Sequence, residues 1–146
     1  MSRGMFFALL FSMGMAISVS GQIRPEEFKA SKREVREQVI AVIAAQLEAF
    51  RTGKVSEAYQ YAATNLRAQT PPRAFGAIVR ENYPAIWSNT HAEFGIVRDD
   101  GKYAAVPVHV YSSSGDAAYD YVLIKERAGW RIGSVTRHEA RRQNNV

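Results

Sequence analysis

The sequence predicts an α+β fold, in which N-terminal helices, one long and two short, pack on a bent four-stranded antiparallel meander. Apolar residues repeat with a helical period up to about Trp87, and from there they alternate with polar residues. Three turn signals divide this second half: Asp99-Asp100-Gly101, Ser112 to Asp116, and Arg127-Ala128-Gly129. Helices that precede a meander are typical of helices lying on one face of a sheet.

The N-terminus is typical of an export signal. Arg3 precedes an apolar run from Met5 to Val19, and the small residues Ser18 to Gly21 suit a cleavage site. The run is shorter than the roughly twenty residues of a membrane-spanning helix. We therefore expect a periplasmic or secreted protein with no stable membrane insertion after cleavage; an uncleaved membrane anchor is the alternative. The expected division of the chain is a signal at 1–21, a lead-in at 22–34, the domain at 35–138 and a basic flexible tail at 139–146.

Composition excludes several classes of site. The 146 residues include no cysteine, which rules out disulfides and thiolate chemistry. The net charge is +5, but the charges are mixed along the chain, and no basic stripe alternates with aromatic residues, so we expect no nucleic-acid partner. The three histidines lack metal-ligand spacing, and no glycine-rich phosphate loop is present, so we expect neither a metal nor a cofactor.

The long helix is expected at about 32–52. Apolar residues from Val35 to Phe50 recur on one face, and Gly53 suits a C-terminal stop. Ser31 to Glu34 matches a capping box, which favours a start there. Pro25, followed by two glutamates, also suits a first helical turn, so the helix starts at one of these two places.

Two shorter helices follow in the prediction. The first should run from about 56 to 63, and the second should open at Thr70-Pro71-Pro72 with Thr70 as its cap. The second helix should end at Tyr83, because the residue before Pro84 avoids the helical conformation. Ala85 to Trp87 then lead into the sheet.

The strands are expected at 90–98, 102–111, 117–126 and 130–138. Asp100-Gly101 suits a tight hairpin turn, since glycine accepts the positive φ that such a turn needs. Pro107 lacks an amide donor, which favours an edge position or a bulge in the second strand. A bulge there would bend the sheet and make one of its faces concave.

Four segments carry a resemblance to a known family. They are Gln46–Gly53 (QLEAFRTG), Ala58–Ala63 (AYQYAA), Ile78–Pro84 (IVRENYP) and Gly129–Gly133 (GWRIG). Together they resemble the bacterial family called domain of unknown function 4864, within the nuclear transport factor 2-like, or cystatin-like, superfamily. The resemblance spans about residues 35–137. It implies a cone-like domain with a pocket between the first helix and the sheet, and it implies no activity.

Two residues are weak catalytic candidates, Asp120 and His109. Buried on an apolar face, the Asp120 carboxyl would have a raised pKa and could act as a general base, and His109 could do so instead. If Tyr111 pairs with Ala117 across a five-residue loop, the two side chains lie on opposite faces; a loop one residue shorter puts them on the same face. The five-residue loop is favoured, which separates the pair. Exposed strand positions are the alternative for both residues.

Aromatic side chains are the expected lining of the pocket. They are Tyr59, Phe75, Tyr83, Trp87, Tyr119, Tyr121 and Trp130. Binding pockets are mainly apolar, although most of these residues could equally fill a core. The sequence therefore favours an exported, non-enzymatic domain that binds a small apolar ligand or an envelope protein partner. The alternative is an isomerase, dehydratase or hydrolase that uses Asp120 or His109 in the cone. Homodimer formation through the sheet is a further expectation.

Overall fold

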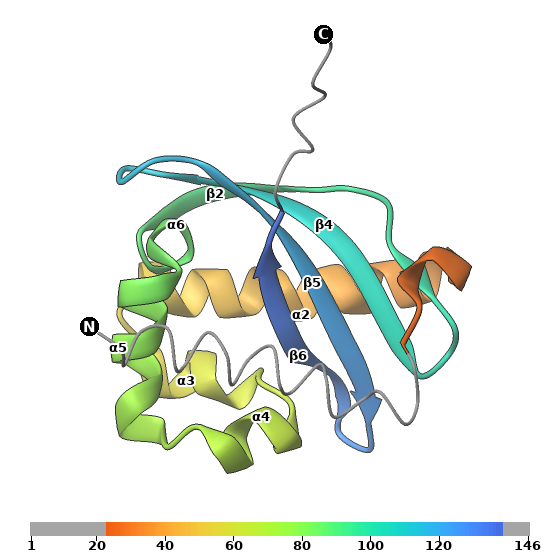
Figure 1. Cartoon of the computed structure of the whole chain (residues 1–146), viewed down its shortest axis with the longest axis horizontal. Coiled ribbons are helices and arrows are strands. Elements are labelled where there is room, and N and C mark those ends of the chain that lie inside the picture. Colours follow the sequence, from red (N-terminus) through yellow and green to blue (C-terminus); the bar gives the residue numbers. More distant parts are fainter. Residues whose placement is uncertain (1–22, 139–146) are drawn as a thin grey trace, which may run out of the picture.

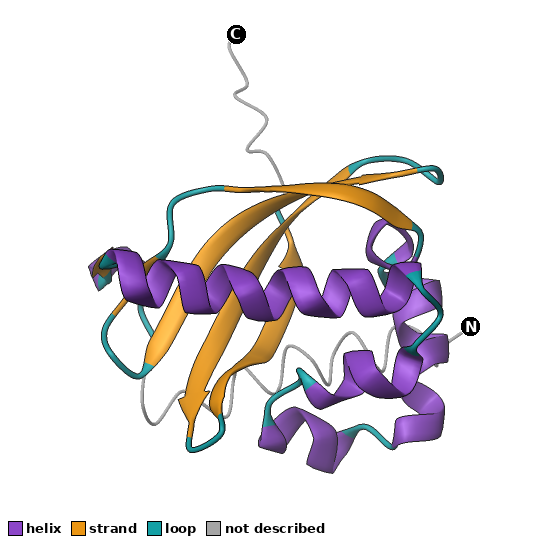
Figure 2. Ribbon diagram, turned by 180° about the vertical axis from the view of Figure 1, so that it is seen from behind, coloured by secondary structure: helices purple, strands orange, loops and turns teal. Residues whose placement is uncertain are grey.

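The computed structural model describes residues 23–138 and confirms the predicted α+β class (Figure 1). A long helix, α2 (Arg33–Arg51), crosses one face of a curved antiparallel sheet, and four short helices gather at one end of it (Figure 2). These are α3 (Val55–Gln60), α4 (Thr64–Gln69), α5 (Pro72–Asn82) and α6 (Pro84–Trp87). The predicted signal at 1–21 and tail at 139–146 lie outside the described residues.

Helix α2 matches the predicted long helix to within a residue at each end. Val39, Ile43 and Leu47 recur at helical spacing and are almost fully buried against the sheet. Gly53 follows the helix with φ at +71°, the left-handed conformation that glycine adopts without strain. The periodic face and the glycine stop therefore determined this element from local sequence.

The predicted capping box is wrong. Lys32 is the N-cap of α2 and makes no side-chain cap. The Ser31 hydroxyl instead donates to the Asp99 carboxylate, and the Ser31 amide donates to the carbonyl of Val97 at 2.8 Å. The serine thus fastens the start of the helix to the sheet. The alternative start at 25 is also wrong, because Pro25–Glu27 forms a separate 3-10 turn, η2.

The short helices differ from the prediction in several places: α3 ends at Gln60 instead of 63, and the segment expected to lead into the sheet forms helix α6. Helix α4 was not predicted, because its stabilising cap comes from a distant element: the Glu126 carboxylate accepts hydrogen bonds from the Thr64 amide and hydroxyl, each at 2.9 Å. Helix α5 begins at Pro72, as expected, but Thr70 does not cap it. Pro71 is the N-cap, and the buried Thr70 offers its carbonyl to Tyr59.

The sheet has six strands within the described residues, two more than the predicted meander. They are β1 (Lys29–Ala30), β2 (Asn89–Phe94), β3 (Arg98–Asp99), β4 (Tyr103–Ser112), β5 (Ala117–Glu126) and β6 (Gly129–Arg137). The order is β1-β3-β4-β5-β6, and β2 pairs with β4 on the same side as β3. The first predicted strand is thus split into β2 and β3, and the lead-in adds β1.

The split between β2 and β3 lies opposite Pro107. The Gly95 amide donates to the Pro107 carbonyl at 2.8 Å, so that side of Pro107 faces the interruption between β2 and β3. In a strand the nitrogen and carbonyl of one residue point to the same side, so the missing proline donor also faces the interruption. A Cβ on Gly95 would lie 2.5 Å from the proline Cγ, which explains the glycine. Pro107 itself is in neither of the two expected settings, an edge position or a bulge, because it pairs with Asp120 in a continuous ladder; the register irregularities lie at Thr90 in β2 and at Gly133 in β6.

The favoured register between β4 and β5 is wrong by one residue. Val110 pairs with Ala117, and Pro107 pairs with Asp120, which is the register of the shorter loop. The Asp116 carboxylate accepts a hydrogen bond from the Ser112 amide at 3.2 Å, which extends the ladder towards the turn. This register also places most of the buried residues of both strands on one face, the exception being Val122, which lies on the other. The residues on the shared face are Ala104, Val106, Val108 and Val110 of β4 and Ala117, Tyr119, Tyr121 and Leu123 of β5.

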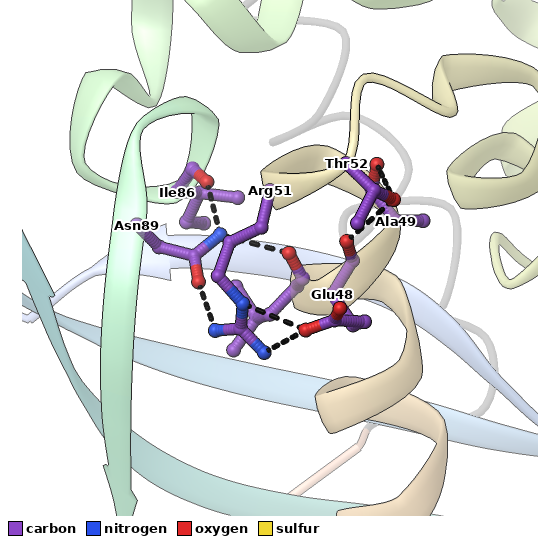
Figure 3. Close-up of polar contacts among 7 residues, drawn as sticks. Glu48, Ala49, Arg51, Thr52, Ile86 and Asn89 are labelled. Atoms are coloured by element: carbon purple, nitrogen blue, oxygen red, sulfur yellow. Dashed lines mark hydrogen bonds and ion pairs between the residues drawn. The ribbon is translucent and has the colours of Figure 1, made fainter.

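A buried asparagine ties the end of α2 to the start of β2 (Figure 3). Asn89 is 3 % exposed, and its amide nitrogen donates to the carbonyls of Leu47 and Ile86 at 3.0 and 2.8 Å. Its side-chain oxygen accepts a hydrogen bond from Arg51 at 2.6 Å. Arg51 also pairs with Glu48, one turn back on α2. One buried side chain therefore joins α2, the α6 turn and β2.

Candidate functional site

The space between the helices and the sheet is almost filled. A cavity of about 30 Å³ remains between α2, α5, α6 and β6. It is lined by Gln46, Phe50, Leu66, Phe75, Val79, Tyr83, Ile86, Ile132 and Val135. A water molecule needs roughly 10–15 Å³ on this measure, whereas drug-sized ligands occupy pockets of about 300–1,000 Å³. The cavity therefore has room for about two waters.

The seven aromatic residues expected to line a pocket lie in or against the core. Phe75 and Tyr83 border the small cavity. The other five do not line it and pack among their neighbours. Tyr59 is edge-on to Phe75 at 5.2 Å between ring centroids, and Trp87 lies 5.9 Å from Phe50. Tyr119, Tyr121 and Trp130 are at most 2 % exposed.

Three of the buried phenols stay protonated at neutral pH. Burial raises the pKa of Tyr83 to about 12, and it raises the pKa values of Tyr119 and Tyr121 as well. The Tyr83 hydroxyl donates to the Val135 carbonyl at 3.0 Å, which fastens the start of α6 to β6. The Tyr121 hydroxyl is buried and has no hydrogen-bond partner. These groups are therefore donors within a packed core.

The observed register brings His109 and Asp120 to the same face of the sheet, which is the outer face, away from α2. His109 is exposed and Asp120 is partly exposed, so neither residue enters the interior. Asp120 contacts a different histidine, with 2.8 Å between its carboxylate oxygen and His138 Nδ1. Both side chains of that pair are about half exposed. Both side chains are open to solvent, and the depressions that they border in the described part of the chain are surface grooves.

Two grooves mark the outer face of the sheet. The first has a volume of about 520 Å³ and crosses β4, β5 and β6. Its apolar lining includes Pro25, Ile96, Ala105, Pro107 and Val122, and its polar lining includes Arg98, Asp120 and Thr136. The second groove, of about 290 Å³, lies beside it and shares Pro107. It is bordered by Glu93, His109, Ala118 and His138.

Ile96 gives the first groove an apolar rim. Its side chain is 60 % exposed, and it is the exposed large hydrophobic residue of the described chain. It lies in the interruption between β2 and β3 that accommodates Pro107. An exposed isoleucine beside an apolar groove with a charged border resembles the arrangement found at protein–protein interfaces, where an apolar centre is surrounded by a polar rim.

An aromatic column continues this face beyond the second groove. The ring centroid of Tyr111 lies 4.5 Å from that of His109 and 5.6 Å from that of His91. The Tyr111 hydroxyl donates to Glu93 at 3.3 Å. All three histidines of the chain therefore lie on the outer face or at its border. In the described part of the chain, no three histidine, aspartate or glutamate side chains come close enough to hold a metal ion.

Comparison with known families identifies the domain. The family model described as "Domain of unknown function (DUF4864)" matches residues 32–145, most of the chain. The chain belongs to the DUF4864 family. The resemblance drawn from the four sequence segments is thereby confirmed at the level of the family. No curated protein matches the sequence. Among residues 23–138 of this DUF4864 chain, no helix is both long and apolar enough to cross a membrane.

The sequence reasoning singled out Asp120 and His109 as catalytic candidates, but it missed the other residues that line the grooves of this DUF4864 domain. Ile96 and Arg98 fall inside one predicted strand, which gave no reason to expect an exposed isoleucine. The available signal was Pro107. A proline in a central strand cannot donate a hydrogen bond to the adjacent strand, so the adjacent strand is expected to be interrupted beside it. Pairing Pro107 with the glycine at 95 would have located the interruption, and with it the exposed residue that follows.

Proposed function

We propose that this chain is an exported, non-enzymatic binding domain whose working surface is the outer face of its sheet. The partner is a protein of the cell envelope that inserts an apolar side chain beside Ile96. The observation that carries this proposal is the exposure of Ile96 at the rim of the larger groove. Interface energy is concentrated in a few apolar or aromatic anchors that fill such depressions.

The arrangement of the layers supports the choice of surface. The described helices α2 to α6 lie on the inner side of the sheet or at its end (Figures 1 and 2). The inner face is committed to the core, and the cavity of about 30 Å³ there is about a tenth of the smallest usual ligand pocket. A protein surface is therefore a better supported binding site than an internal ligand pocket.

The charged residues beside the groove would set the orientation of the bound partner. Arg98 borders it from β3, and Asp120 borders it from β5. A partner with an acidic group near the first residue and a basic group near the second would be held in one direction. Complementary charges of this kind contribute mainly to specificity and to the association rate.

Site-specific photo-crosslinking in the native cell tests the proposal. A photoreactive residue at Thr136, on the groove, should give one discrete adduct, and one at Gln38, on the exposed side of α2, should not. Ile96→Asp should reduce the Thr136 adduct at least tenfold, whereas Gln38→Asp, which adds the same charge elsewhere, should leave it unchanged. The captured protein, once purified, should bind the wild-type chain and not the Ile96→Asp variant in calorimetry.

The mass of the adduct distinguishes an envelope protein from a second copy of this chain. An adduct with twice the mass of the chain would identify a second copy, which the expected homodimer also predicts. Equal adducts from Thr136 and Gln38, or binding insensitive to Ile96→Asp, would contradict the proposed surface.

Export is tested independently, by N-terminal sequencing of the mature chain: we expect cleavage after Ser20 or Gly21 and recovery outside the cytoplasm. An intact N-terminus in the cytoplasmic fraction would contradict it.

A further inference from the structure

A second surface, separate from the outer grooves, is rich in arginine. A cleft of about 540 Å³ lies between α4 and the turn that joins β5 to β6. It is lined by Gln60, Thr64, Arg67, Glu126, Arg127 and Arg131, together with Ala128. Three guanidinium groups therefore surround one depression, and a single carboxylate accompanies them among the lining residues.

The walls of the cleft are held by backbone hydrogen bonds. The corner between α3 and α4 pairs with β6 through a parallel bridge from Ala62 to Ile132. The Ala63 amide donates to the Ile132 carbonyl, and the Ile132 amide donates to the Tyr61 carbonyl, each at 2.8 Å. These hydrogen bonds fix the α3–α4 corner relative to β6. The backbone positions of Arg67 and Arg131 therefore need no ligand to order them.

The carboxylate of the cleft is already occupied. Both oxygens of Glu126 accept hydrogen bonds from Thr64, which leaves the glutamate capping α4. Among residues 23–138, none of the guanidinium groups of Arg67, Arg127 and Arg131 forms an ion pair with a carboxylate. Arg131 instead donates to the carbonyl of Trp130 at 2.8 Å.

Arg67 carries the buried unpartnered donor among the three cations of the cleft. Its Nε is buried and has no hydrogen-bond partner. Its terminal nitrogen lies 3.4 Å from Gln60 Oε1, which is longer than the usual N–H···O hydrogen bond. Arg67 lines the cleft, and apart from the long contact with Gln60 its terminal N–H groups form no hydrogen bond among residues 23–138, so they can donate to an oxyanion there.

We propose that this cleft binds a small oxyanion of charge about −2, a phosphate monoester or a dicarboxylate. Three arginines and one glutamate leave a local charge of two, which such an anion neutralises. Guanidinium groups present paired N–H donors that match the oxygens of both anions. The volume lies within the range of about 300–1,000 Å³ that accommodates small molecules, so the oxyanion can belong to a larger ligand.

Calorimetric titration of the purified full chain tests the site, with inorganic phosphate and succinate as probes and ionic strength held constant with sodium chloride. We expect saturable binding of at least one probe. Arg127→Gln and Arg131→Gln should each weaken binding about tenfold or more, since a charge-assisted hydrogen bond contributes about 1.5–3 kcal/mol. Arg80→Gln, which removes the same charge from an exposed position on α5, should change it less than twofold.

Tighter binding of phosphate assigns the phosphate class, and tighter binding of succinate assigns the dicarboxylate class. Binding weaker than about 10 mM for both probes would overturn the proposal. So would binding that Arg80→Gln weakens as much as the cleft variants do, because the chain would then act only through its overall charge. Arg127 lies on an exposed turn, so its variant keeps the test valid even if substitution of Arg67 or Arg131 unfolds the domain.

Discussion

Replacing Tyr121 with phenylalanine should stabilise the domain. Tyr121 is 0 % exposed on the inner face of β5, and its hydroxyl has no hydrogen-bond partner. In the unfolded chain that hydroxyl is hydrated, so folding costs its desolvation free energy, roughly 1–3 kcal/mol, without compensation. Tyr121→Phe removes the cost and keeps the ring. We expect the free energy of unfolding to rise by about 1 kcal/mol, which corresponds to an increase in Tm of about 3 °C.

Tyr59→Phe provides the matched comparison, because the substitution is the same and the surroundings differ. The Tyr59 hydroxyl lies 2.9 Å from the Arg67 carbonyl oxygen and 2.7 Å from that of Thr70. Its removal should lower the free energy of unfolding by about 1 kcal/mol. Guanidinium chloride unfolding, followed by circular dichroism, should therefore separate the two variants by about 2 kcal/mol. Equal destabilisation by both would refute the reasoning, since it would show that the Tyr121 hydroxyl has a partner in solution.

Three other perturbations have defined outcomes. Gly95→Ala should lower the free energy of unfolding by about 1–3 kcal/mol in the same assay, because the added methyl would lie 2.5 Å from Pro107 Cγ; no change would show that the strand interruption is mobile. Asn89→Leu should lower the free energy of unfolding by about 3 kcal/mol and lower Tm, because it removes the donors to the Leu47 and Ile86 carbonyls and the acceptor for Arg51. At alkaline pH, the unfolded chain releases the Tyr83 proton near pH 10, whereas the folded chain holds it to about pH 12. The contribution of Tyr83 to stability is therefore complete below pH 10 and should fall by about 2 kcal/mol by pH 12, in addition to the losses from Tyr119 and Tyr121. The stability of a Tyr83→Phe variant should decline less steeply than that of the wild type, and an equally steep decline would contradict this cause.

Local sequence determined the elements whose stabilising contacts are local. The period of α2 and the glycine after it predicted that helix closely, and turn residues predicted β4, β5 and β6 within one residue at each end. The register between β4 and β5 failed because it was inferred from the length of a loop. The apolar pattern held the answer: Val108 and Tyr119 belong on one buried face, and only the shorter loop puts them there.

The remaining prediction errors have a common physical cause. Residues far apart in the sequence supply the hydrogen bonds that cap helices and line sites. The cap of α4 comes from Glu126, 62 positions away, and Ser31 is drawn from its predicted capping role by Asp99, 68 positions away. Arg67 and Arg131 likewise meet across one cleft although no motif joins them. Such sites become visible only when the strands and helices that carry them are placed in space.

The two proposed surfaces can be tested independently because the sheet itself separates them. Asp120 on the groove and Glu126 in the cleft are six positions apart on β5, which is roughly 20 Å along an extended strand, and the two sets of lining residues have no member in common. Effects of substitutions this far apart are usually additive. Ile96→Asp should therefore leave oxyanion affinity unchanged, and Arg127→Gln should leave partner binding unchanged. If the double variant showed coupling, the core between the surfaces would have to adopt two arrangements, and its dense packing around a cavity of only about 30 Å³ argues against that.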